Sequence, residues 1–269
     1  MTLLDFFFPP KWSLGMRDMI LRIVSLPPFK TPAELNIDRT ILYGPNGAGK
    51  SVIMRVIFSL ISEDPIKILK KYFRDDYIDM INVSLLTSLD TEDNIEIAKI
   101  NNGRADGVAR IFNVSFIEND VAYIRKYVSR EKIDIKHNFK TIFRDRHFMN
   151  KVRSFLLDLD VSLDEKYFSH GIKRAIMILY TIENSDIIFI EGFENNLHID
   201  TLRILFEYID EYKDRTIIIE THNSLLLKLG VLKGWSVYYI DRNMIKKLNK
   251  TEDLRDLDIF RREVESIVV

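Results

Sequence analysis

A glycine-rich loop followed by a lysine and a serine is the part of the sequence with the clearest chemistry. Its residues are Gly44-Pro45-Asn46-Gly47-Ala48-Gly49-Lys50-Ser51, with the spacing G-x-x-x-x-G-K-S. Glycines let backbone N–H groups converge on phosphate oxygens, and the positive end of a following helix strengthens the attraction. At this spacing the Lys50 ammonium reaches the β- and γ-phosphates, and the Ser51 hydroxyl takes one position around Mg²⁺. The loop therefore predicts a site for ATP with Mg²⁺, built from Gly44, Asn46, Gly47, Ala48, Gly49, Lys50 and Ser51.

The segments around the loop are those that such a site requires. An apolar run over residues 37–43 predicts a strand that enters the loop, and helical apolar spacing over 51–62 predicts a helix that leaves it. Strands predicted at 186–190, 215–220 and 235–240 alternate with helices predicted at 171–184, 200–212 and 224–229. This alternation predicts an α/β fold with a mostly parallel core sheet and helices on both faces.

The middle of the chain has a different pattern. Short apolar runs at 82–86, 95–100 and 110–117 alternate with polar turns and predict strands of an antiparallel subdomain. The last two are expected to pair with each other, because Asn-Gly and Asp-Gly turn signals lie between them. From about 119 to 165 the sequence is charge-rich and is predicted to be helical, most clearly over 146–159.

Composition narrows the class of protein. The 269 residues are 46% hydrophobic and 29% charged, as in soluble globular proteins, and a net charge of −1 gives no overall basic field for nucleic acid. There is no cysteine, so disulfides and thiolate zinc sites are excluded. No apolar run is long enough to cross a bilayer, and residues 1–10 lack the features of a signal peptide. We expect a cytoplasmic protein whose apolar N-terminus packs on the core or, alternatively, offers an aromatic patch to a partner.

Three motifs further along the chain occur in the order found in ABC-type ATPases. Residues 168–174 (FSHGIKR) resemble the ABC signature L-S-x-G-x-x-R/Q. Residues 187–198 (IIFIEGFENNLH) resemble an apolar strand followed by D-E-x-E-N-G-L-H, and residues 217–224 (IIIETHNS) resemble a strand followed by T-H-S. With the loop G-P-N-G-A-G-K-S, these motifs are similar to those of the RecF/SMC/OLD-type branch, whose members are not transporter subunits. The resemblance extends from about residue 20 to 240 and implies one P-loop NTPase domain of ABC-ATPase type over residues 1–269, with a small helical lobe at about 120–170 before the signature.

The resemblance also implies how two subunits share nucleotide. In the family, the serine and glycine of the signature lie at a helix N-terminus and contact the γ-phosphate bound by the other subunit. Carried over to this chain, those residues are Ser169 and Gly171. They imply a homodimer that holds two ATP molecules between its subunits.

The carboxylates expected after the Walker B strand are altered in this chain. Alignment on the E-N-x-L-H residues places Glu191 at the Walker B aspartate, where it joins Ser51 as a magnesium ligand, and Gly192 at the catalytic glutamate. A longer carboxylate suits the strict octahedral geometry of Mg²⁺ less well, and glycine has no side chain with which to polarise water. Glu194 is the nearest replacement carboxylate. We expect nucleotide binding to be intact and turnover to be altered, and a glutamate restored at position 192 to raise it.

Other contacts with nucleotide are less sharply defined. His222 aligns with the switch histidine and is predicted to donate a hydrogen bond to the γ-phosphate from a near-neutral ring. With Glu191 and Glu194 it completes the predicted catalytic set. Asn119 is a weak match to the transporter Q-loop. The adenine ring has several aromatic candidates, namely Phe29, Trp12 and the cluster Phe6–Phe8.

Three functions fit these motifs. The first is an ATP-hydrolysing motor or switch that acts in DNA maintenance or phage defence, on nucleic acid or on a separate nuclease or effector chain. The second is an ATP-binding module with weak or no hydrolysis that uses ATP to hold a dimer together. The third is the nucleotide-binding subunit of a transporter, which the missing Q-loop disfavours. Residues 67–74 and 125–146 are basic and would be the segments that meet DNA, although such runs are commonly solvated helix faces.

Overall fold

Short apolar strands lie parallel to one another at the centre of the structure. The computed structural model describes residues 19–88, 94–107, 112–126, 129–162, 164–242 and 244–249. Within these ranges an eight-stranded sheet has the order β13-β12-β3-β11-β10-β7-β8-β9, and its central pairs, from β12 to β7, are parallel. The parallel strands are β3 (Arg39–Tyr43), β7 (Val114–Glu118), β10 (Ile187–Ile190), β11 (Thr216–Thr221) and β12 (Ser236–Asp241). Antiparallel strands extend both edges, namely β8 (Val121–Arg125), β9 (Arg130–Asp134) and β13 (Met244–Leu248).

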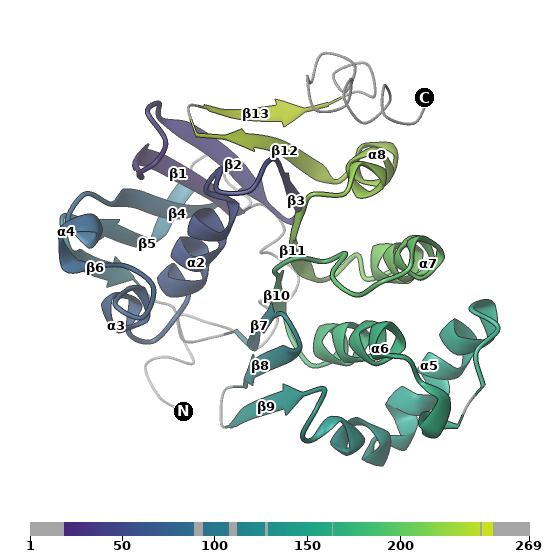
Figure 1. Cartoon of the computed structure of the whole chain (residues 1–269). Coiled ribbons are helices and arrows are strands. Elements are labelled where there is room, and N and C mark those ends of the chain that lie inside the picture. The colour runs from purple at the N-terminus through teal and green to yellow at the C-terminus, as the bar shows by residue number, and fades with distance from the viewer. Residues whose placement is uncertain are drawn as a thin grey trace.

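A second sheet is entirely antiparallel. It has five strands in the order β2-β1-β4-β5-β6 within the described ranges. These strands are β1 (Met19–Ser25), β2 (Ala33–Ile37), β4 (Asn82–Ser88), β5 (Asn94–Asn101) and β6 (Arg104–Gly107). The helix α2 (Lys50–Leu60) contacts β4 and β5 of this sheet and β11 of the other, so it lies between the two sheets (Figure 1).

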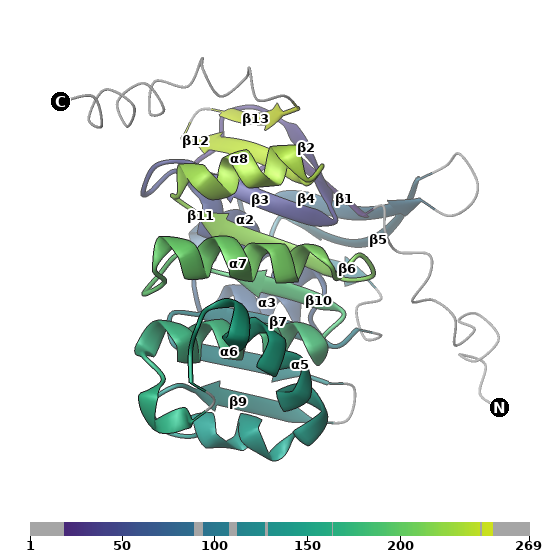
Figure 2. The same cartoon turned by 90° about the vertical axis from the view of Figure 1, so that its right-hand side faces the viewer.

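The remaining helices divide between the two sides of the central sheet. On the side of α2 lie α3 (Pro65–Leu69) and α4 (Asp75–Ile78). On the opposite side lie α5 (Arg146–Asp158), α6 (His170–Glu183), α7 (Ile199–Asp210) and α8 (Ser224–Leu232), which face the viewer in Figure 2. Two 3₁₀ turns, η2 (Phe139–Arg144) and η3 (Glu165–Tyr167), precede α5 and α6.

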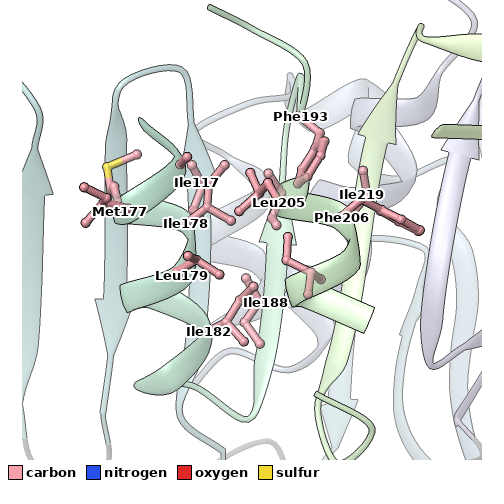
Figure 3. Packing of buried hydrophobic residues seen from close by; sticks show 14 of the residues in the cluster. Ile117, Met177, Ile178, Leu179, Ile182, Ile188, Phe193, Leu205, Phe206 and Ile219 are labelled. Carbon is pink, nitrogen blue, oxygen red and sulfur yellow. The ribbon is translucent and has the colours of Figure 1, made fainter. Parts of the chain in front are cut away.

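Apolar side chains from α6 and α7 pack on the central sheet and fix these two helices in place. Figure 3 shows Ile182 of α6 beside Ile188 of β10, with Leu205 of α7 in the same cluster, and all three are fully buried. The strand β10 has all four residues buried, and β11 has all six. Burial on both faces explains why these strands read as continuous apolar runs rather than as alternating patterns. The residues that follow them are therefore held on a rigid base.

The mostly parallel core, the helices on both faces and the antiparallel subdomain are present, but two local predictions were wrong. Strand β7 does not pair with β5; it joins the central sheet beside β10, and β5 forms its hairpin with β6. The Asn-Gly turn was predicted correctly, but its second strand, at Arg104–Gly107, is short and mostly polar, so it carried no apolar signal.

The predicted helical segment from about 119 to 165 was also wrong in its first part. Residues 121–125 and 130–134 form the antiparallel pair β8 and β9. Along β8, Ala122 and Ile124 are buried while Tyr123 between them is exposed, a two-residue period that charged neighbours obscured. The helical lobe therefore begins only at η2. Among the described residues, no helix is long and apolar enough to cross a membrane.

Candidate functional site

The glycine-rich loop joins the end of β3 to the start of α2, as the sequence predicted. Gly49 is the N-cap residue of α2 and has φ of 105°, a conformation that favours glycine. Lys50 is only 2% exposed, and its Nζ donates to the carbonyl oxygens of Gly44 and Pro45 at 2.9 Å each. Burial lowers the pKa of Lys50, against the opposing charges of Glu220 and Glu194. The loop is thus closed around a buried ammonium group.

A small cavity opens beside this loop. Its volume is about 250 Å³, and its lining residues are Pro28, Asn46, Gly47, Gly49, Lys50, Ser51, Val52 and Glu220. Backbone N–H groups at the start of a helix together with a lysine favour an anion of the size of a phosphate group. The predicted phosphate-binding residues Asn46, Gly47, Gly49, Lys50 and Ser51 therefore surround one cavity.

Glu220 is the acidic residue at this cavity, and sequence analysis did not single it out. It is the fifth residue of β11, the strand that pairs directly with β3, and it is 6% exposed. The Ser51 hydroxyl donates to Glu220 Oε2 at 2.8 Å, and Lys50 Nζ lies 3.8 Å from Oε1. Burial raises the pKa of Glu220, against the hydrogen bond from Ser51 and the charge of Lys50. The sequence signal that could have identified Glu220 is a carboxylate that directly follows three isoleucines in a predicted buried strand.

Glu191, predicted as the Walker B carboxylate, contacts a different residue of α2. Arg55 Nη2 lies 3.1 Å from Glu191 Oε1 and 3.4 Å from Oε2, and it also lies 3.4 Å from Glu118 Oε1. The Arg55 guanidinium stacks over the ring of Tyr72, with 4.6 Å between its Cζ and the ring centroid. Arg55 is four residues after Ser51, so Glu191 is held one helical turn away from the serine that it was expected to join.

The loop after β10 is held by the signature helix. Arg174 of α6 is fully buried, and its Nη2 donates to the carbonyl oxygens of Glu191 and Gly192 at 3.1 and 2.8 Å. Gly192 has φ of 57°, and a Cβ built there would lie 2.3 Å from Asn195 Nδ2. A side chain at position 192 would strain this loop. A glutamate at Gly192 could therefore raise turnover only if this loop and the Asn195 side chain move to accept it.

Glu194 fixes the position of His222 instead of standing free. Its Oε2 accepts from the Thr221 hydroxyl at 2.8 Å and its Oε1 from the His222 backbone N–H at 2.6 Å. The His222 Nδ1 lies 2.7 Å from the Gly44 carbonyl oxygen and 3.4 Å from Lys50 Nζ. A carbonyl only accepts, so the shorter contact assigns the ring proton to Nδ1. Burial and the charge of Lys50 lower the pKa of His222, so the ring is neutral at pH 7.

The signature residues lie at the start of α6, on the opposite side of the central sheet from α2 (Figure 1). Ser169 is the N-cap, and its hydroxyl accepts from the Ile172 N–H at 3.2 Å. A Cβ at Gly171 would lie 2.3 Å from the Asn196 carbonyl oxygen, so the helix approaches the loop after β10 closely. No hydrogen bond or ion pair between described residues joins Ser169 or Gly171 to the phosphate loop of the same chain.

The remaining predicted contacts are placed as follows. Phe29 packs against the phosphate loop, because a Cβ at Gly49 would lie 2.7 Å from its Cζ, and the ring is 8% exposed. Asn119 has φ of 52° and lies in the turn between β7 and β8, next to the Glu118 that contacts Arg55. Phe6–Phe8 and Trp12 lie outside the described residues.

Comparison with solved structures shows the fold class. The SMC head domain from Thermotoga maritima superposes with a TM-score of 0.54, at 13% identity over 87% of this chain and 99% of that chain. A bacterial Atm1-family ABC exporter with ATP bound gives a TM-score of 0.54 at 15% identity, over 97% of this chain and 44% of the exporter chain. This chain thus spans less than half of the exporter chain. No protein-family model and no curated protein matches the sequence. At these identities the likeness shows that the chain has the fold of an ABC-type ATPase.

Proposed function

We propose that this chain binds ATP with Mg²⁺ on the loop Gly44–Ser51 and uses the nucleotide to join two copies of itself. The main support for nucleotide binding is the loop at the start of α2, which encloses the buried Lys50 and lines a cavity large enough for a phosphate group. When bound, Mg²⁺ neutralises charge on the phosphates, and Ser51 would be among the residues that hold it. Glu220 lies in the same cavity and supplies a second oxygen donor.

We propose dimerisation because the phosphate loop and the signature residues lie apart within one chain. Ser169 and Gly171 lie at the start of α6, on the opposite side of the central sheet from α2, the helix that follows the phosphate loop. A second copy placed head to tail would bring its own helix N-terminus to the phosphate of the first. We assign the chain on its motifs to the RecF/SMC/OLD-type branch, and we propose an effector chain or nucleic acid as the partner of the dimer.

We propose that hydrolysis is slow and resets the dimer. Arg55 pairs with Glu191, the Thr221 hydroxyl and the His222 backbone N–H donate to the two oxygens of Glu194, and Gly192 has no side chain. These contacts leave neither of the two predicted carboxylates unpaired for work on a water molecule. They equally favour the second candidate function, a binding module in which ATP holds the dimer and turnover is absent.

Measurements of the ATP hydrolysis rate and of the molecular mass in solution distinguish the hydrolysing switch from the binding module. With Mg²⁺-ATP, we expect the wild-type chain to move from monomer to dimer in light scattering and to hydrolyse ATP faster than Lys50→Ala. The variant Lys67→Ala, which removes an exposed lysine of α3, serves as the matched control and should behave as wild type. A nucleotide-dependent dimer whose rate equals that of Lys50→Ala would favour the binding module. If the molecular mass in solution is the same with and without Mg²⁺-ATP, the proposed dimer is wrong.

A further inference from the structure

Two carboxylates lie at the ends of neighbouring strands beside α2, but only Glu220 lies at the phosphate loop. Glu220 is near the end of β11, which pairs with β3, the strand that carries the loop. Glu191 follows β10, which is one strand further away. The cavity beside the loop is lined by Glu220 together with Lys50 and Ser51, and Glu191 is not among its lining residues. The order of the strands thus places Glu220 at the cavity and Glu191 away from it.

The oxygen atoms of Ser51 and Glu220 already stand at the spacing that Mg²⁺ requires. Adjacent ligands of an octahedral Mg²⁺, each at about 2.1 Å from the ion, lie about 3 Å apart. Ser51 Oγ and Glu220 Oε2 are 2.8 Å apart. One hydroxyl and one carboxylate are hard oxygen donors of the kind that Mg²⁺ prefers, with water and phosphate oxygens completing its shell. The pair therefore fits this ion without displacement of either strand or helix.

Glu191 does not fit the same role. Both of its carboxylate oxygens face Arg55 Nη2, at 3.1 and 3.4 Å, and the Glu191 side chain is 19% exposed. Use of this carboxylate for Mg²⁺ would break the arginine pair and leave a guanidinium beside a dication, which costs electrostatic energy in a partly buried place. Glu118 and the Tyr72 ring hold Arg55 from two other sides. Glu191 therefore contributes to an ion pair that fixes α2 to the sheet.

We propose that Glu220 is the carboxylate ligand of Mg²⁺ in this chain and that Glu191 is a positioning residue. The inference rests on the proposed function, because it needs nucleotide on the loop Gly44–Ser51. Glu220 and Ser51 would together hold the ion, which would neutralise charge on the phosphates. The Ser51 hydroxyl turns its proton away from the carboxylate so that both oxygens face the ion.

Metal binding can be read directly with Mn²⁺, which replaces Mg²⁺ and is counted by electron paramagnetic resonance. The probes are Mn²⁺ and the non-hydrolysable β,γ-imido analogue of ATP, applied to wild type, Glu220→Gln, Glu191→Gln and Lys50→Ala. Glu220→Gln keeps the shape of the side chain and an oxygen that accepts from Ser51, but removes the charge. We expect it to weaken Mn²⁺ binding to the nucleotide complex by at least about tenfold. Glu191→Gln should stay close to wild type.

A second measurement without metal distinguishes loss of a ligand from loss of the fold. In EDTA, nucleotide binding by Glu220→Gln should equal that of wild type or be tighter, because a negative charge beside the phosphates is gone. If Glu220→Gln does not fold, as judged by its thermal transition, Glu220→Asp replaces it; this variant keeps the charge but draws the carboxylate back by one methylene, so it should show a smaller but measurable loss of Mn²⁺ affinity. Loss of Mn²⁺ binding in Glu191→Gln, alone or equally with Glu220→Gln, would overturn the inference. Nucleotide binding by Lys50→Ala equal to wild type would instead overturn the proposed function.

Discussion

Replacing Arg174 by alanine is expected to lower the free energy of unfolding by about 2–4 kcal/mol. Arg174 is fully buried and is the largest fully buried side chain of the described residues. Its removal leaves a cavity, the Glu191 carbonyl oxygen loses the Arg174 donor, and the Gly192 carbonyl oxygen keeps only the Asn195 N–H. Burial lowers the pKa of Arg174 to about 10, so the guanidinium remains charged at pH 7 and its loss also relieves a desolvation cost. Urea denaturation followed by circular dichroism measures the change.

A second variant distinguishes the effect of lost side-chain volume at position 174 from the effect of lost hydrogen bonds. Arg174→Met fills most of the space but cannot donate, so we expect it to recover part of the loss, to about 1–3 kcal/mol below wild type. Lys173→Ala in the same turn of α6 removes a half-buried lysine and is the control, with a small effect. Equal stability of Arg174→Ala and wild type would show that the contact between α6 and the loop after β10 contributes nothing.

Gly44→Ala is expected to have a second large effect, both on stability and on nucleotide binding. A Cβ at Gly44 would lie 2.0 Å from the Ile240 carbonyl oxygen of β12, and φ at Gly44 is 155°. The obstacle is backbone of a paired strand, which cannot rotate aside, so either the loop or β12 must move. We expect a loss of about 2–4 kcal/mol in the free energy of unfolding. Nucleotide binding should fall with it, because the Gly44 carbonyl oxygen also holds Lys50 and His222.

The same substitution at Gly47 provides the control. Gly47 has φ of 72°, and a Cβ added there would have Arg242 Nη2 as its nearest neighbour, 3.5 Å away at the end of a flexible side chain. Gly47→Ala therefore carries only the left-handed backbone cost, about 1 kcal/mol. Thermal unfolding of the two variants compares them directly. Similar losses in both would contradict the steric account of Gly44.

These contacts connect the signature helix to the phosphate loop within one chain. Arg174 holds the backbone at Gly192, and Glu194 a short distance along that loop holds the His222 backbone. The His222 ring in turn contacts the Gly44 carbonyl. The start of α6 is thus linked to the phosphate loop by these hydrogen bonds together with the backbone between Gly192 and Glu194. In a head-to-tail dimer, α6 would meet the partner's nucleotide, so the same contacts would link the two sites.

The parts of the fold that the sequence predicted best are those buried on both faces. Residues 187–190 and 217–219 are all Ile or Phe, so a buried strand could be predicted at each without knowledge of its neighbours. Strand β9 has the charged residues Arg130 and Lys132 at its exposed positions, and β8 ends at the charged Arg125, so the two-residue period was not recognised in this charge-rich segment. Pairing partners far apart in sequence, such as β7 with β10, leave no local signal.

The motifs of the candidate site could be predicted from the sequence, but the contacts between their side chains could not. Spacing alone located Gly44–Ser51, because that chemistry is local to one loop and one helix. Alignment placed Glu191 near Ser51, but the choice between Ser51 and Arg55 depends on a turn of α2 that only three-dimensional packing sets. Glu220 was read as the end of a strand. Its place at the cavity follows from the pairing of β11 with β3, which could not be predicted from the sequence.

Equilibrium binding of ATP tests the central claim most directly. Isothermal titration of the purified chain with ATP and Mg²⁺ should show one nucleotide bound per chain for wild type. Lys50→Ala removes the ammonium group that is proposed to bind the phosphates, together with its contacts to Gly44 and Pro45. It should show no measurable binding while it unfolds as cooperatively as Lys67→Ala. Absence of binding by the folded wild-type chain, or equal binding by Lys50→Ala, would contradict the account.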